Sequence, residues 1–255
     1  MAKGITRDAI VDAALAVLDD VGMDGLTVRA VAERLDVKAP ALYWHVRDKK
    51  ALLDEMGTRV WTEIGRAVPV LGGAAATVTS ADAGGADTAT GDAPGDKDAA
   101  DAGRAAAAST PSVNGWRDAL EQYAQATRRG LLAHRDGARA FSGTALTDAS
   151  MLRGQEAGLA WMETQGFSVE ATTDAVALLT SFTVGSCIEE QERAQAPAGT
   201  YDLEKRDAAV DAASHPRVAA SGRYGYGGSA DERFAAQLAI VLDGIASLRS
   251  ASPLL

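Results

Sequence analysis

The side chains between residues 27 and 50 are of the types that contact double-stranded DNA. Five Lys or Arg stand against two Asp from residue 34 to residue 50, although the whole chain of 255 residues has a formal net charge of −10. Cations neutralise backbone phosphates, and an arginine can donate two hydrogen bonds to one guanine edge. Because net charge governs long-range steering rather than a local site, an acidic protein can still bind DNA here. The candidate contact residues are Arg29, Pro40, Ala41, Tyr43, His45 and Lys49.

These residues need a scaffold of two short helices that are joined by a tight turn and packed on a longer first helix. Apolar residues at helical spacing predict the first helix over 6–21, with Thr6 as a candidate N-cap. Short helices are expected over 28–35 and 39–46, followed by a long helix that Asp48 caps. In such a helix-turn-helix, the second short helix lies in the major groove with its N-terminal residues at base edges.

A resemblance to a known family favours this DNA-binding interpretation. On its own, the pattern fits equally well a structural helix whose Tyr43-Trp44-His45 cluster packs in the core. However, residues 6–61 resemble the DNA-binding domain of the TetR family of transcriptional regulators. The resemblance is clearest in Gly25-Leu26-Thr27-Val28-Arg29 and from Leu42 to Asp54. A second resemblance, to the regulatory core of the tetracycline-repressor branch of that family, covers the segments 131–139, 143–144, 166–168 and 182–192.

The resemblance implies an all-α fold. We expect a three-helix helix-turn-helix domain over 1–47, a connecting helix over 48–68, and a ligand-binding and dimerisation domain over 114–250. The implied function is a homodimeric repressor that leaves a palindromic operator when a small molecule binds, and that controls an efflux or antibiotic-related gene. The alternatives are an activator or architectural DNA-binding protein without an effector, and an interaction module that binds no DNA.

The resemblance also marks where this chain departs from its branch in DNA recognition. Trp44 occupies a further DNA-contact position of the family. Ala39 stands where the branch has a base-reading glutamine, and Val28 stands where it has a threonine. An alanine offers a base only a methyl contact, so we expect a different operator sequence.

The expected ligand site departs further. Phe141 stands where the branch has a histidine that binds the magnesium ion of the drug, Gly158 replaces a glutamine, and Tyr123 replaces an asparagine. A phenyl ring binds no metal, and magnesium prefers several oxygen ligands, so we expect an apolar or aromatic effector bound without a metal or other cofactor. Each residue of the expected lining also fits an ordinary core position. The lining comprises Tyr123, Thr127, Phe141, Thr144, Leu159, Val176, Thr180 and Glu189.

Two long apolar helices are expected to form the dimer. The resemblance implies that helices over about 169–195 and 231–249 make a four-helix interface with the second copy, and we expect Leu238 and Leu242 to face the partner. Ligand binding would then shift the connecting helix over 48–65 and move the two DNA-binding units out of register with their half-sites.

The segment 69–113 differs in composition from the rest of the chain. From Gly72 to Ser112 it contains no aromatic residue and no Leu, Ile or Met. Such a segment cannot bury enough apolar surface to offset chain entropy, so we expect a flexible insertion. It is either inert or folds on a partner.

Several other function classes find no support in the sequence. The three histidines, His45, His134 and His215, belong to no catalytic or metal-binding motif, and neither a phosphate-binding loop nor a nucleophile elbow occurs, so we expect no enzyme. The lone Cys187 excludes an internal disulfide and is expected to be buried. No signal peptide or run of 18 apolar residues is present, which predicts a cytoplasmic protein without a membrane partner.

Overall fold

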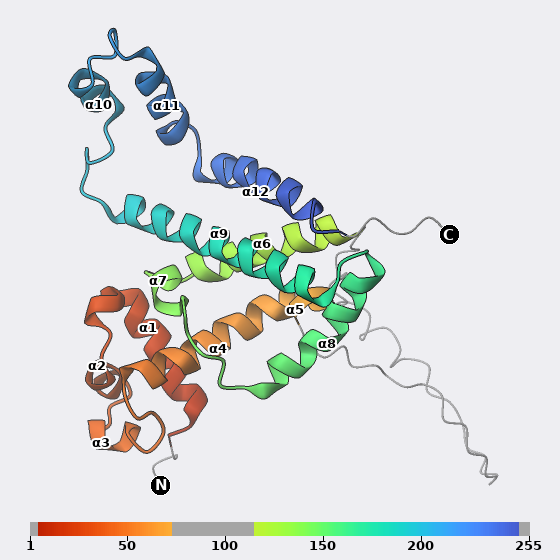
Figure 1. Ribbon diagram of the computed structural model, residues 1–255. Helices are drawn as coiled ribbons and strands as arrows, with labels where there is room; N and C mark the ends of the chain where they lie inside the picture. Colours follow the sequence, from red (N-terminus) through yellow and green to blue (C-terminus); the bar gives the residue numbers. More distant parts are fainter. Residues whose placement is uncertain (1–4, 73–114, 250–255) are drawn as a thin grey trace, which may run out of the picture.

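The computed structural model describes residues 5–72 and 115–249, and within these ranges every regular element is a helix. Figure 1 shows α4 running from the first three helices toward α5 and the larger helical part. Most of the predicted insertion lies outside the described residues, but its first four residues form α5. The helices are α1 (Arg7–Gly25), α2 (Val28–Arg34), α3 (Ala39–Leu42), α4 (Lys49–Ala67), α5 (Pro69–Gly72), α6 (Trp116–Leu132), α7 (Gly137–Phe141), α8 (Ala149–Thr164), α9 (Val169–Gln195), α10 (Leu203–Ala209), α11 (Pro216–Tyr226) and α12 (Ala230–Ala246).

The helices of the N-terminal unit begin where capping side chains dictate. Thr6, Thr27 and Asp48 each accept a hydrogen bond from the backbone amide three residues later, at the start of α1, α2 and α4. Each cap satisfies an amide that has no partner inside the helix. Gly22 has a φ of 72°, so the regular part of α1 stops at the predicted position and one further turn continues to Gly25.

The core consists of two clusters of buried apolar residues. The first joins the N-terminal unit to the regulatory part, because it runs from Ile10 and Leu42 through Leu52 on α4 to Phe141 and Cys187. The second holds α6, α8, α9 and α12 together and includes Leu120, Met162, Leu179 and Phe234, among others. Since α4 contributes to the first cluster along much of its length, the DNA-binding helices and the regulatory part share one packed core.

The structure differs from the sequence prediction at two places. The third helix is regular only over Ala39–Leu42, and residues 43–45 form a turn instead of continuing to 46. The segment 196–230, for which the sequence predicted at most one short helix, contains α10 and α11. These two helices stand away from the main body (Figure 1) and are joined by an ion pair of 3.0 Å between Arg223 and Asp207.

Helix α9 is long and apolar enough to cross a membrane by length and composition alone. In this fold it packs instead against α6, α7, α8 and α12. The buried side chains of α9, such as Leu179 and Cys187, therefore pack within the protein, whereas Val169 and Leu178 stay exposed.

Candidate functional site

The helix-turn-helix presents its aromatic residues outward. The side chains of Leu42 and Val46 are buried in the core, whereas Tyr43 is 56% exposed and Trp44 is 89% exposed. The alternative in which Tyr43 and Trp44 form a core cluster is therefore wrong. Exposed large aromatic side chains are costly to leave in water, and they suit a surface that meets a partner. Among the other predicted contact residues, Arg29 and Pro40 are exposed, and Ala39, Ala41 and His45 are half-buried.

The cations of this surface differ in how freely they can approach DNA. Arg47 pairs with Asp48 at 3.2 Å and Arg29 pairs with Glu33 at 3.0 Å, and all four side chains are largely exposed, so both arginines can exchange these partners for phosphate. Lys49, which the sequence assigned to phosphate, donates a hydrogen bond of 2.8 Å to the carbonyl oxygen of Met23 on α1. Arg47 and the exposed Lys38 count among the five cations of 34–50 but were not among the predicted contact residues, although both flank α3.

A pocket of about 470 Å³ lies between α4, α6, α8 and α9. This volume is in the range that holds a drug-sized ligand. Six of the eight predicted ligand-binding residues line it, namely Tyr123, Phe141, Thr144, Leu159, Val176 and Thr180. The prediction missed Trp61 and Ile64 on α4 and Leu71 on α5, which also contribute to the wall. Their apolar character was visible in the sequence, but their orientation depends on how α4 crosses α6.

Two predicted ligand-binding residues lie elsewhere. Thr127 is fully buried but is not part of the pocket wall. Glu189 is exposed, lines a different groove beside α12, and pairs with Arg193 at 3.7 Å, so it does not line this pocket within the protomer. It follows Thr180 by nine residues, which places it about 13 Å further along the axis of α9.

The pocket wall contains a pair of neighbouring hydroxyl groups from α6 and α9. The Tyr123 hydroxyl and Thr180 Oγ1 lie 3.2 Å apart. Burial raises the pKa of Tyr123, and the hydrogen bond with Thr180 only partly offsets this, so the phenol stays protonated at neutral pH. A magnesium ion does not fit this wall, because its described residues offer hydroxyl and amide groups but neither a carboxylate nor an imidazole.

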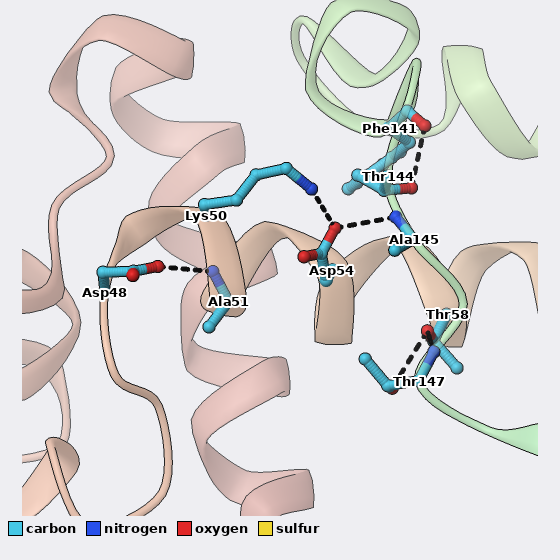
Figure 2. A network of polar contacts seen from close by, with 9 residues as sticks. All are labelled: Asp48, Lys50, Ala51, Asp54, Thr58, Phe141, Thr144, Ala145 and Thr147. Carbon is cyan, nitrogen blue, oxygen red and sulfur yellow. Dashed lines mark hydrogen bonds and ion pairs between the residues drawn. The ribbon is translucent and has the colours of Figure 1, made fainter.

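The segment 142–148, which connects α7 to α8, touches the pocket and α4 at once. Thr144 lines the pocket, and its hydroxyl donates a hydrogen bond of 2.9 Å to the carbonyl oxygen of Phe141. The next amide, of Ala145, donates a hydrogen bond of 2.8 Å to Asp54 Oδ1 on α4, as Figure 2 shows. Asp54 also pairs with Lys50 one turn earlier on the same helix.

A second contact extends this attachment by one turn of α4. The amide of Thr147 donates a hydrogen bond of 2.9 Å to Thr58 Oγ1, and the two threonine hydroxyls lie 3.1 Å apart (Figure 2). Between Asp54 and Thr58, Gly57 lies so close to Thr144 that a Cβ at residue 57 would overlap the threonine hydroxyl. The segment therefore lies directly on α4, the helix that begins beside the DNA-binding turn.

Known proteins resemble the chain over nearly its whole length. The family model described as "Bacterial regulatory proteins, tetR family" matches residues 10–56, and the model described as "Tetracyclin repressor-like, C-terminal domain" matches residues 110–249. The chain belongs to the TetR family. The tetracycline repressor protein class C of Escherichia coli is 32% identical to this TetR-family chain over 96% of the chain and 92% of the relative.

Solved structures of the TetR family agree with this fold. A possible TetR-family transcriptional regulator from Streptomyces coelicolor is 28% identical, with a TM-score of 0.68 over 96% of this chain and all of that one. The class A tetracycline repressor in complex with 5a,6-anhydrotetracycline and magnesium is also 28% identical, with a TM-score of 0.57 and the same coverage. Both matched family models describe bacterial transcriptional regulators, and the chain is such a regulator, with a helix-turn-helix and a ligand-binding C-terminal domain.

A groove of about 590 Å³ lies between α9, α11 and α12 of this TetR-family protein. Ile240 on α12 is 70% exposed and Tyr224 on α11 is 77% exposed, and both line the groove. Leu238 and Leu242, which the sequence placed on the dimer interface, are only 2% exposed because they pack in the protomer's own core. The exposed Ile240 therefore lies on a different face of α12 from these leucines.

Proposed function

We propose that this protein is a homodimeric repressor that leaves its operator when a small molecule occupies the 470 Å³ pocket. The observation that carries the proposal is the position of segment 142–148, which lines the pocket through Thr144 and is hydrogen-bonded to α4 through Ala145 and Thr147. A ligand that displaces this segment must either break these bonds or move α4 with it.

The proposed response needs only a modest energy difference. If the effector favours the arrangement with displaced helix-turn-helix units by a few kcal/mol, the population of the DNA-binding arrangement falls by two orders of magnitude or more. In a dimer, a small rotation of each α4 changes the spacing of two recognition surfaces that must fit half-sites about one helical turn apart. The proposal therefore requires the homodimer as well as the pocket.

The effector in this proposal is aromatic or apolar and needs no metal. The buried ring of Phe141 and the neutral hydroxyl of Tyr123 support this choice, since neither supplies the charged oxygen ligand that magnesium prefers. The class A tetracycline repressor, by contrast, was solved with an anhydrotetracycline and magnesium. Control of an efflux or antibiotic-related gene is proposed by analogy with such relatives.

The proposal is tested by fluorescence anisotropy of the protein on DNA from upstream of its own gene and the adjacent gene, over a series of salt concentrations. We expect saturable binding at one palindromic site, steep weakening with salt, and loss of binding in Tyr43→Ala. Because the Tyr43 side chain is 56% exposed, this variant should keep its melting temperature, which a thermal scan checks. Weak binding that is equal on all sequences and indifferent to the substitution would contradict the proposal.

Release by a ligand is tested on the same complex. Compounds that quench Trp61, which lines the pocket, should also lower the affinity for the operator. A pocket ligand that raises this affinity would indicate an activator or co-repressed regulator. If pocket ligands leave the affinity unchanged, the architectural alternative is favoured and the proposed release is refuted.

A further inference from the structure

The pocket wall is uncharged, in contrast to the rest of the chain. Charged residues make up 24% of the sequence, yet the 18 described residues that line the pocket include no Asp, Glu, Lys, Arg or His. Burial alone does not explain this, because Gln155, Thr173 and Ala177 lie on exposed parts of α8 and α9 at the pocket wall. The absence of charge therefore extends to positions where water would readily solvate a charged side chain.

Most hydroxyl groups of the wall already donate a hydrogen bond to the backbone. Thr172 and Thr173 donate to the carbonyl oxygens of Ser168 and Val169, at 2.9 and 2.8 Å, and Thr144 donates to Phe141. The Tyr123–Thr180 pair differs, because it holds two hydroxyl hydrogens and its mutual bond uses only one. The remaining hydrogen is thus available, either to a ligand oxygen or to the buried Thr127 hydroxyl, which also acts on Tyr123 and has no other hydrogen-bond partner among the described residues.

These two observations define the ligand. An ion in this pocket would lose water without gaining an opposite charge, and a buried unpaired ion is strongly disfavoured. Trp61, Tyr123 and Phe141 offer aromatic surface to flat rings. We propose that the effector is an uncharged polycyclic aromatic molecule with a hydroxyl or carbonyl oxygen that accepts a hydrogen bond from the Tyr123–Thr180 pair. The inference rests on the proposed function only in calling this ligand the effector.

The charge preference is tested with three probes that share one ring system. These are 2-(hydroxymethyl)anthraquinone, anthraquinone-2-carboxylate and 2-(aminomethyl)anthraquinone, which are neutral, anionic and cationic at pH 7. Binding to the full chain is followed by tryptophan quenching and by calorimetry. We expect the neutral probe to bind at least about tenfold more tightly than either ion, because neither ion finds a partner in the wall. In Trp61→Phe the quenching should fall while the calorimetric affinity remains similar, which locates the probe.

The hydrogen-bond partner is tested with conservative variants. Tyr123→Phe and Thr180→Val each remove one hydroxyl of the pair and should weaken the neutral probe about three- to tenfold. Thr183→Val is the matched control, since Thr183 lies on α9 outside the pocket wall and its hydroxyl donates to the Leu179 carbonyl oxygen of the same helix, and it should bind the neutral probe as the parent does. Thermal melting confirms that all three variants are folded.

The outcomes separate this inference from the proposed function. Equal or tighter binding of either ion, no binding of the neutral probe, or equal losses in Thr183→Val and Tyr123→Phe would overturn the inference. The operator complex is then titrated with the neutral probe. If the probe binds with the expected preference but does not release DNA, the ligand class stands and the proposed release fails. If an ionic ligand binds the pocket more tightly and releases DNA, the proposed function stands and the inference fails.

Discussion

Asp54 on α4 accepts a hydrogen bond of 2.8 Å from the amide of Ala145, one residue beyond the pocket-lining Thr144. We therefore predict that Asp54→Ala weakens the link between ligand and DNA. Coupling between two sites is typically worth 1–3 kcal/mol, and loss of one such hydrogen bond should remove about 1 kcal/mol of it. The ratio of operator affinities without and with pocket ligand, measured by anisotropy, should fall about fivefold.

The matched control for Asp54→Ala is Lys50→Met. Lys50 pairs with the same carboxylate but is largely exposed, so its loss should change the affinity ratio little. An Asp54→Ala protein that binds ligand and DNA normally and keeps the full ratio would show that the signal does not pass through Ala145.

A second prediction concerns the close approach of α4 to segment 142–148. Alanine normally stabilises a helix by about 1 kcal/mol relative to glycine. At residue 57, however, the new Cβ would overlap the Thr144 hydroxyl, and such overpacking costs about 1–3 kcal/mol. We expect Gly57→Ala to lower the free energy of unfolding measured in urea. Gly244→Ala on α12, where a Cβ meets no atom within 4 Å, should be neutral or stabilising. A gain of stability in both variants would contradict the close contact.

The sequence predicted the helices well wherever capping residues and apolar periodicity act locally. Thr6, Thr27 and Asp48 cap their helices at the predicted residues because each cap depends on a hydrogen bond three residues away. α11 was missed because its polar, glycine-containing sequence has no clear periodicity. It is tied to α10 by the ion pair between Arg223 and Asp207, which only the tertiary arrangement reveals.

The candidate pocket was predictable in outline but not in its edges. Tyr123, Phe141 and Thr144 were found because family resemblance marks these positions. Glu189 was assigned to the pocket from the family resemblance, but the sequence does not show how far along α9 the pocket reaches, and within the protomer Glu189 lines a different groove. Leu238 was misassigned for a related reason, because an apolar stripe on α12 does not reveal whether it packs in its own protomer or on a partner.

The salt dependence of DNA binding should distinguish Lys49 from Arg47. The Lys49 ammonium is held by the Met23 carbonyl oxygen, so Lys49→Met should reduce stability by about 1 kcal/mol and leave the salt slope nearly unchanged. Arg47 is exposed, and Arg47→Gln should reduce the slope of log K against log salt by about one for each protomer. Anisotropy titrations at several salt concentrations, with urea unfolding alongside, measure both effects. The reverse pattern would place Lys49 on a phosphate and Arg47 away from DNA.

Asp136 should make the contact between α1 and the regulatory part sensitive to acid. Burial raises the pKa of this carboxyl group, but hydrogen bonds from the Met23 amide and from Gln195, both 2.9 Å, outweigh it and lower the pKa overall. Because the pKa of the folded state lies below the unfolded value of about 4, the carboxylate stabilises the fold above pH 4. This stabilisation is lost as the pH falls through the lower, folded-state pKa.

The substitution that tests this is Asp136→Asn, since asparagine tolerates the positive φ of 55° at this position. We expect the variant to be about 1 kcal/mol less stable than the parent at pH 7 in urea unfolding at fixed protein concentration, and the difference to shrink below pH 4. Asp211→Asn is the matched control at a φ of 50°, where the carboxylate bonds only Ser214 nearby, and it should cost less. If the difference in stability between the parent and Asp136→Asn grew as the pH fell, the pKa of Asp136 would be raised in the folded state rather than lowered.

The last prediction separates the dimer interface from the protomer core on one helix. Ile240 is 70% exposed and lines the groove between α9, α11 and α12, whereas Leu238 is 2% exposed and lies within the protomer. Ile240→Glu should therefore yield a folded monomer in sedimentation velocity, with an unchanged helical circular dichroism spectrum, because a carboxylate is costly only where the second copy would cover it. Leu238→Glu buries the same charge in the core and should lower the melting temperature or prevent folding. A dimer that survives Ile240→Glu would place the partner on another face and remove the geometric basis for operator binding by paired helix-turn-helix units.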